Sequence, residues 1–204
     1  MTTPSRHSGH LSRFLHGVRL PRGVSERSVP RGPGELSDAA EAAVRGYLAC
    51  RPEATVVVLG EGLGTGFRRL DNGRLTWLSV LPPADAAARR MLLPDTPRRH
   101  TAARPGTGAG WPDAVRAAGA AERGVVVAVP GTPAGLPARA IGELVAVCAA
   151  RFPGGALVLD ALPRWTATAL RAARLHPAVA AVRIRRPAAR TAVGEVRFAA
   201  RGGA

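Results

Sequence analysis

The sequence predicts an α/β fold built on a mostly parallel sheet, with an antiparallel strand at the C-terminal end of that sheet. Apolar β-branched runs such as 55–59 and 124–129 are typical of strands that are buried on both faces. Stretches with helical spacing of apolar residues alternate with these runs, which favours parallel strands joined by crossover helices. Two alternations of apolar residues with arginine, at 179–184 and 194–198, lie close enough along the chain to pair antiparallel.

The first helix is predicted to begin near the start of the ordered domain, at residues 37–38. Asp38 and Glu41 resemble a capping box in which Asp38 is the cap. The apolar residues that then recur at helical spacing are Ala40, Val44, Tyr47 and Leu48. The elements predicted next are the strand 55–59, a short helix 66–70 ended by a turn at 71–73, the strand 75–80, the helix 84–93 closed by Pro94, and a weak strand 100–103.

The second half of the chain continues the alternation. Its predicted elements are the helix 111–118, the strand 124–129, the helix 137–151, the strand 156–159, the helix 165–174, and the strands 179–184 and 194–198. The helix 137–151 has the clearest apolar face. Residues 1–35 are rich in Ser, His, Arg, Pro and Gly and lack periodicity, which predicts a poorly ordered basic arm before an ordered domain over 36–204.

The net charge of +15 is typical of nucleic-acid-binding proteins. However, every basic residue except histidine is arginine, Gln is absent and Asn72 is the single Asn, a bias expected of a GC-rich genome. The arginines are scattered and lack interleaved aromatic residues for base stacking. We therefore expect no specific nucleic-acid partner, and binding driven by charge alone remains an alternative.

Cys50 and Cys148 lie far apart, with no CxxC motif and no His at ligand spacing. Both are predicted to be buried free thiols, and no metal site is expected. No apolar run approaches membrane-spanning length, and no secretion signal stands at the N-terminus, so a cytoplasmic location without membrane contact is expected.

The loop that follows the strand 55–59 has glycine at every second position, at Gly60, Gly62, Gly64 and Gly66. Glycines at a strand exit let the backbone approach a ligand closely, because no Cβ blocks it. A P-loop needs Lys after its last glycine, and here Phe67 stands there instead. The dinucleotide spacing Gly-x-Gly-x-x-Gly does not fit either, so neither common phosphate-binding motif explains the loop.

Glu61 gives the loop a negative charge that suits a cationic ligand. S-adenosylmethionine, which carries sulfonium and ammonium groups, is such a ligand. The predicted cofactor contacts in this loop are Gly60, Glu61, Gly62, Leu63 and Gly64. The alternatives are a glycine-rich turn that binds no ligand, with Glu61 as a solvated acid.

Several spaced segments between residues 43 and 165 resemble one family, the O-methyltransferases of polyketide biosynthesis in the leucine carboxyl methyltransferase group. The segments are 44–48 (VRGYL), 51–63 (RPEATVVVLGEGL), 67–80 (FRRLDNGRLTWLSV), 89–95 (RRMLLPD), 151–155 (RFPGG) and 160–165 (DALPRW). The resemblance implies a Rossmann-like class I methyltransferase sheet and S-adenosylmethionine as the cofactor.

The chain departs from the family where acidic residues are expected. After the second strand the family has Val-Asp-Leu-Pro, and this chain has Leu81 at the position of the acid that grips the ribose hydroxyls. Leu81 is therefore predicted to lie at the ribose end of the cofactor site, with Asp85 as a weak substitute. Segments 104–107 and 130–133 also replace family motifs. If the alignment holds, Leu81→Asp should tighten cofactor binding.

Methyl transfer from a sulfonium is an in-line displacement that depends on alignment and, for a hydroxyl acceptor, on a base. The candidate bases are His100, Asp160 and His176, each with a structural role as the favoured alternative, so the catalytic residues stay unassigned. Trp77 and Trp165 are expected to pack, Trp111 to begin a helix near the site, and Arg68 and Arg69 to be a solvated pair.

These observations favour a methyltransferase-like protein that uses S-adenosylmethionine to methylate a hydroxyl of a small, polyketide-type molecule. The alternative is a degenerate, non-catalytic homologue that serves as an accessory or binding protein. The glycine loop favours the first hypothesis, and the missing acid at Leu81 favours the second.

Overall fold

The computed structural model describes residues 34–103, 110–117, 122–131, 138–163, 170–185 and 191–201. Most of the predicted basic arm, Trp165 and the segment 104–107 lie outside these residues. The division into an arm at 1–35 and a domain at 36–204 stays a prediction.

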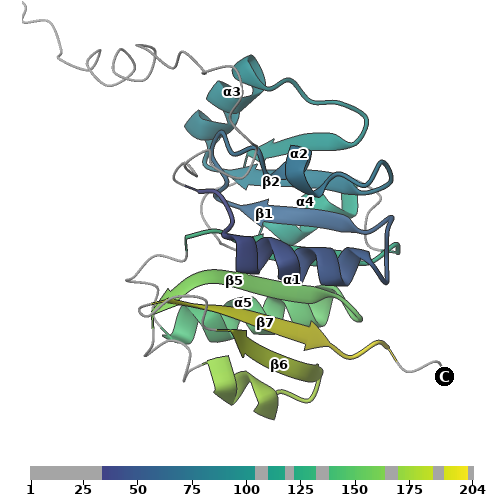
Figure 1. Ribbon diagram of the computed structural model, residues 1–204, viewed down its shortest axis with the longest axis vertical. Helices are drawn as coiled ribbons and strands as arrows, with labels where there is room; N and C mark the ends of the chain where they lie inside the picture. The colour runs from purple at the N-terminus through teal and green to yellow at the C-terminus, as the bar shows by residue number, and fades with distance from the viewer. Residues whose placement is uncertain are drawn as a thin grey trace, which may run out of the picture. The chain divides into compact units, whose positions relative to one another are not determined.

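Seven strands form one sheet in the order β3-β2-β1-β4-β5-β7-β6 (Figure 1). The strands are β1 (Thr55–Leu59), β2 (Thr76–Leu81), β3 (Arg99–Ala103), β4 (Val125–Val129), β5 (Ala156–Pro163), β6 (Val179–Arg185) and β7 (Thr191–Phe198). The first five strands pair parallel, and β7 pairs antiparallel with both β5 and β6. The predicted α/β fold with an antiparallel C-terminal end is confirmed.

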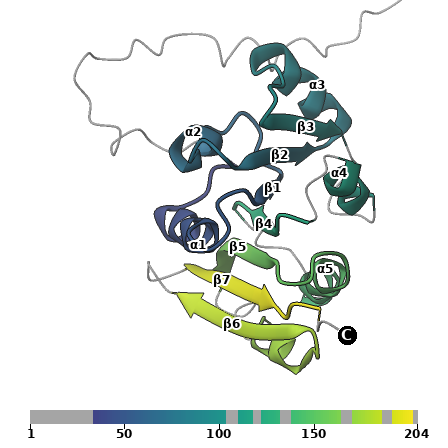
Figure 2. The same ribbon diagram turned by 90° about the vertical axis from the view of Figure 1, so that its right-hand side faces the viewer.

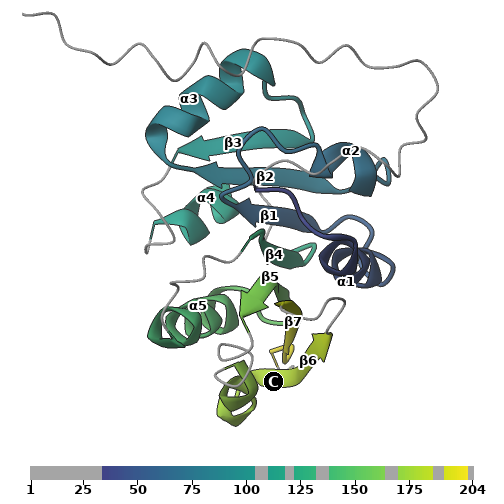
Figure 3. The same cartoon turned by 60° about the vertical axis from the view of Figure 1, so that its left-hand side comes forward.

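Helices cover both faces of the sheet. They are α1 (Asp38–Leu48), α2 (Gly66–Leu70), α3 (Pro83–Leu92), α4 (Trp111–Ala117) and α5 (Ala138–Arg151), with a short 3-10 turn at Ala173–Leu175. Helices α1 and α2 lie on one face, and α4 and α5 lie on the other (Figure 2). Helix α3 lies beside the edge strand β3 (Figure 3). None of the helices in the described part of the chain is long and apolar enough to cross a membrane.

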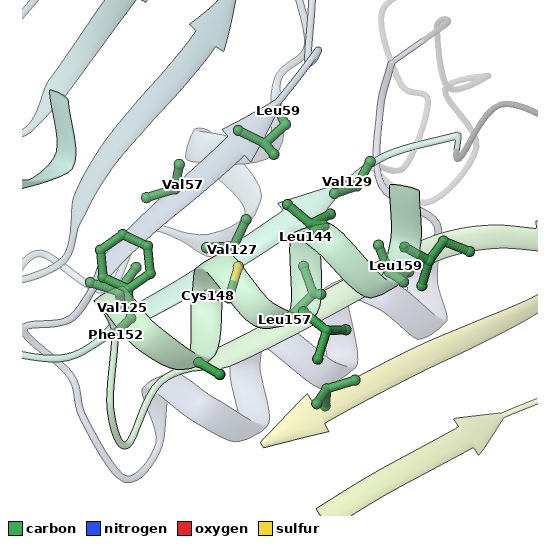
Figure 4. Close-up of a cluster of buried hydrophobic side chains, with 14 of the residues drawn as sticks. Val57, Leu59, Val125, Val127, Val129, Leu144, Cys148, Phe152, Leu157 and Leu159 are labelled. Atoms are coloured by element: carbon green, nitrogen blue, oxygen red, sulfur yellow. The ribbon is translucent and has the colours of Figure 1, made fainter. Parts of the chain in front are cut away.

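The sheet separates two buried apolar clusters, built mainly from Ala, Val and Leu as the composition predicts. Strands β1 and β4 are buried at all five of their residues, because both of their faces are covered. In one cluster, Leu144 and Cys148 of α5 pack on Val57, Val127 and Leu157 of the sheet (Figure 4). Burial of this apolar surface is the main favourable contribution to folding.

Several strands run beyond their predicted bounds: β7 begins at Thr191 and not at residue 194, and β2 and β5 end later than expected. Strand β2 continues through Leu81, which pairs with Ala103 of the edge strand β3. Strand β5 continues from Leu159 to Pro163 through a register shift, because Leu162 and Pro163 pair with Ala192 and Thr191 of β7 beyond the shift. A strand's end depends on its neighbour, and local sequence carries little information about that neighbour.

Two local predictions are wrong. Ser37, and not Asp38, caps α1: its backbone is extended, and its hydroxyl accepts a hydrogen bond from the Ala40 N–H at 3.3 Å. Cys50 is exposed, because α1 ends at Leu48 and the chain turns toward solvent there. Cys148 is buried, as predicted.

Candidate functional site

The loop 60–66 follows β1 at the point where the strand order reverses. The chain leaves β1 to form β2 on one side, and it later returns to place β4 on the other side. In open α/β sheets, ligands bind beyond the carboxyl ends of the strands at such a reversal. Gly60 and Leu63 are exposed there, and Leu63 is 53% exposed as a residue.

The glycines of the loop serve two different purposes. Gly60 and Gly62 have φ angles of +84° and +63°, a conformation that other residues rarely adopt. Gly64 and Gly66 are needed for space, because a Cβ on Gly64 would lie 2.7 Å from Glu61 Cγ and one on Gly66 would lie 3.0 Å from the Trp77 ring. Half of the glycine pattern therefore reflects packing inside the loop.

Glu61 points into the protein and is 2% exposed. Its Oε2 accepts hydrogen bonds from Ser79 Oγ at 2.7 Å and from Trp77 Nε1 at 2.9 Å, and it pairs with Arg89 Nη2 at 3.2 Å. Its Oε1 lies beside the backbones of Gly64 and Gly66. The carboxylate is thus held inside the fold through Oε2, and the alternative of a solvated loop acid is wrong.

Arg89 reaches the loop from α3 and is 1% exposed. Its Nη2 pairs with Glu61, and its Nη1 donates a hydrogen bond to the carbonyl oxygen of Gly62. Burial raises the pKa of Glu61 above its usual value, against the lowering influence of Arg89, Ser79 and Trp77. Burial also lowers the pKa of Arg89, so desolvation outweighs the mutual attraction of the two charges in both groups.

The segment just before α1 lies over the loop. A Cβ on Gly34 would be 2.7 Å from the Glu61 carbonyl oxygen, so this residue packs directly on the loop backbone. Glu35 Oε1 accepts hydrogen bonds from the N–H and the hydroxyl of Thr65, both at 2.8 Å. Figure 1 shows this segment, in purple, passing the arrowhead of β1 before α1 begins.

Asp160 holds the same segment at its other end. Its carboxylate accepts hydrogen bonds from the Ser37 N–H at 2.6 Å and the Ser37 hydroxyl at 2.7 Å. It also accepts one from the N–H of Ala161, which has a φ of +53° at the register shift in β5. Asp160 is 4% exposed. It directly follows Leu159, the last residue of β5 that pairs with β4, so it lies at the same end of the parallel strands as the glycine loop. Its oxygens, however, are occupied by these hydrogen bonds to Ser37 and Ala161.

The two candidate histidines lie near the amino ends of the parallel strands, opposite the ends that carry the glycine loop. His100 is the second residue of β3, so it lies near the amino end of a parallel strand, and its Nε2 contacts the Pro97 carbonyl at 3.2 Å. His176 precedes β6, which begins beside the start of β5, and its Nδ1 accepts a hydrogen bond from the Ala178 N–H. Neither side chain lies beside the glycine loop.

Leu81 is the last residue of β2 and is 2% exposed. It shares a sheet face with Trp77 and Ser79, because alternate residues of a strand point the same way. In this structure its side chain is part of the protein interior. Contact between Leu81 and a ribose stays a prediction, and Asp85 is exposed on α3.

The remaining candidates have structural roles in the described part of the chain. Trp77 is fully buried, and Trp111 begins α4 and packs on Phe152. Arg68 is exposed, whereas Arg69 binds the buried carboxylate of Glu41 at 2.6 Å, so these arginines are not a solvated pair. No group of three His, Cys, Asp or Glu residues in the described segments could hold a metal ion.

Sequence reasoning missed Arg89 and Ser79 as partners of the loop. A signal for Arg89 was present in its spacing, because it lies three residues after Ala86 and so shares the buried side of α3. A charged residue at a core position requires a buried partner. The identity of that partner follows only from the fold, because Glu61 is 28 residues away in the sequence.

Comparisons with known proteins agree with this architecture. No protein-family model matches the chain, and no curated protein matches it by sequence. The S-adenosylmethionine-dependent methyltransferase SibL, in its apo form, aligns with a TM-score of 0.57 and 13% identity over 80% of this chain and 55% of SibL. The N-methyltransferase NodS from Bradyrhizobium japonicum WM9 aligns with a TM-score of 0.53 and 12% identity, covering 79% of this chain and 93% of NodS.

Human N-acetylserotonin methyltransferase, solved in complex with S-adenosylmethionine, aligns with a TM-score of 0.54 and 10% identity over 78% of this chain and 51% of the human protein. This chain therefore spans about half the length of SibL and of the human enzyme, and nearly all of NodS. At these identities the similarity establishes the fold alone, which is that of the class I methyltransferases.

Proposed function

We propose that this protein is an S-adenosylmethionine-dependent O-methyltransferase that acts on a hydroxyl group of a polyketide-type small molecule. The observation that carries the proposal is the position of the loop 60–66, which ends β1 at the strand reversal of a methyltransferase-type sheet. The resemblance to the polyketide O-methyltransferases of the leucine carboxyl methyltransferase group supports the acceptor class. A cytoplasmic location is part of the same proposal.

The loop fits the amino-acid end of the cofactor through its backbone. Gly60 and Gly62 leave the main chain open to close approach, and Leu63 is exposed beside them. Glu61 and Gly64 contribute by shaping the loop from within, because the Glu61 carboxylate fills the space beneath Gly64. The resemblance implies that Leu81 lies at the ribose end, where a leucine side chain would offer no hydrogen-bond acceptor.

The residues of this chain act mainly by binding and alignment. S-adenosylmethionine, when bound, supplies the methyl group on an electrophilic sulfonium, and the protein must hold the acceptor oxygen in line with it. Asp160 directly follows the part of β5 that pairs with β4, but its oxygens hold Ser37 and Ala161. Removing the acceptor proton through Asp160 would therefore require the segment around Ser37 to move.

Calorimetric titration of the full chain with S-adenosylhomocysteine tests the proposal. We expect weak binding, because the loop is present and the ribose acid is replaced by Leu81. A lost bidentate contact costs about 1.5–3 kcal/mol, which corresponds to roughly one to two decades in affinity. No heat at millimolar ligand would reject cofactor binding, and a submicromolar dissociation constant would reject the importance of the missing acid.

The second candidate function is that of a non-catalytic homologue with an accessory or binding role. Leu81 favours it: the side chain is buried and apolar, and the resemblance implies a carboxylate at this position in the family. The positions of His100 and His176, at the sheet edge away from the loop, favour it as well. Under this hypothesis, titration with S-adenosylhomocysteine gives no signal at any concentration.

A further inference from the structure

In the ion pair beneath the glycine loop, both charged side chains are almost completely buried. Arg89 and Glu61 have side-chain exposures of 1% and 3%, and they join α3 to the loop that follows β1. Ser79 and Trp77 of β2 bind the same carboxylate oxygen, so three elements meet at one atom.

Stability alone does not account for such a pair. Removing two charges from water is costly, and apolar replacements of buried pairs are often neutral or stabilising. A buried pair is better suited to defining one conformation in a segment that has several available. The loop is such a segment, because Gly60 and Gly62 both adopt positive φ and glycine restricts the backbone least.

Arg89 acts on one peptide unit of the loop. Its Nη1 donates to the Gly62 carbonyl oxygen, and this bond directs that oxygen into the protein interior. In a planar trans peptide, the carbonyl and the next N–H point in opposite directions. The N–H of Leu63 therefore points outward, at the exposed carboxyl edge of the sheet.

Neighbouring bonds hold the loop on either side of this peptide. The Gly60 N–H donates to the Val80 carbonyl at 3.0 Å, and the Gly64 N–H donates to the Glu61 carbonyl at 3.2 Å. Between them, the Gly62–Leu63 peptide is held by the guanidinium of Arg89. Loss of that group frees this peptide to rotate, since its glycine residue permits both orientations.

We infer that Arg89 and Glu61 are positioning residues, which hold the Gly62–Leu63 peptide so that the Leu63 N–H faces the cofactor and can donate to an anionic group of it. This inference rests on the proposed function and names the residues that prepare its cofactor site. Glu61 acts through Arg89, whose guanidinium it orients, and neither side chain touches the ligand. The negative charge of Glu61 attracts no ligand directly in this arrangement.

The decisive variant is the double substitution E61Q/R89M. It removes both charges and the donor to Gly62 while leaving no unpaired buried ion, so the fold is expected to survive with nearly unchanged stability. Binding of S-adenosylhomocysteine should nevertheless weaken about tenfold, the loss typical of one hydrogen bond. Arg89→Lys, which retains a cation able to donate to Gly62 or to Glu61, should restore part of this affinity.

Glu195→Gln is the matched control. Glu195 is a buried carboxylate paired with Arg197 at 2.5 Å. It lies on β7, which strands β4 and β5 separate from β1 and its loop. We expect this variant to lower the melting temperature while leaving the dissociation constant within twofold of that of the wild type. The inference is overturned if E61Q/R89M binds as well as the wild type, or if Glu195→Gln weakens binding equally.

A second readout separates this inference from the proposed function. In the amide NMR spectrum of the unliganded protein, the Leu63 resonance should be single in the wild type and shifted or broadened in E61Q/R89M. An unchanged Leu63 resonance overturns the positioning role, whether or not the wild type binds S-adenosylhomocysteine. The wild type could bind no S-adenosylhomocysteine while its Leu63 resonance still differs from that of E61Q/R89M. This result rejects the proposed function and retains the role of Arg89 in holding the Gly62–Leu63 peptide.

Discussion

Leu81→Asp separates two accounts of the end of β2. Leu81 is 2% exposed, so in this structure an aspartate there would be a carboxyl group in the protein interior. Lost packing at a buried leucine costs about 2–5 kcal/mol. Each unit by which burial raises the pKa of the new carboxyl adds about 1.4 kcal/mol at neutral pH. The sum is a large share of a typical folding stability of about 5–15 kcal/mol.

Urea denaturation at pH 7 and pH 5 measures this cost, with Leu81→Asn as the uncharged control of similar shape. A carboxyl group whose pKa is higher in the folded than in the unfolded state destabilises the fold most at pH values above both. We therefore expect the Asp variant to be less stable than the Asn variant at pH 7, with a smaller difference at pH 5. A stable Asp variant that binds S-adenosylhomocysteine more tightly would refute the interior placement and support Leu81 as the ribose position.

Three further predictions concern the cap, the thiols and the surface charge. Ser37→Ala should lower the unfolding free energy by about 1–2 kcal/mol, because Ser37 both caps α1 and binds Asp160. Thermal unfolding should show this as a melting temperature lower by roughly 3–6 °C. A thiol reagent should label the exposed Cys50 in the native protein and Cys148 only after denaturation. Cys148 is protected because burial raises the pKa of its thiol far above the usual range. The expected count is one label per chain before denaturant is added and two afterwards. Any retention on DNA should show no sequence preference and fall steeply with salt, because scattered arginines neutralise phosphates without reading bases; a sequence-specific complex at physiological salt contradicts this.

The strands and helices of the sheet were predictable because their signals are local. The runs that form β1 and β4 are apolar at nearly every position, and α5 carries its apolar residues on one face. The ends of β2 and β5 were not predictable, because Ala103 and Ala192 supply the pairing that extends them. Partners of this kind become visible only when the strand order is known.

The loop illustrates the same limit within the candidate site. Its glycines and its position after β1 were evident from the sequence, and both point to a ligand. The direction of the Glu61 side chain was not evident, because it depends on Arg89, Ser79 and Trp77 from other elements. Likewise, a structural role was the favoured alternative for Asp160, but its partner, Ser37 at the start of α1, was not evident because it is 123 residues away in the sequence.

The central claim is that the loop after β1 receives S-adenosylmethionine. The most direct test is an amide NMR titration of the wild-type chain with S-adenosylhomocysteine, which reports binding and its location together. We predict a saturable change centred on Gly60, Gly62, Leu63 and Gly64, with the resonances of β6 unaffected. Unchanged spectra at millimolar ligand, or changes confined to residues remote from this loop, would contradict the claim.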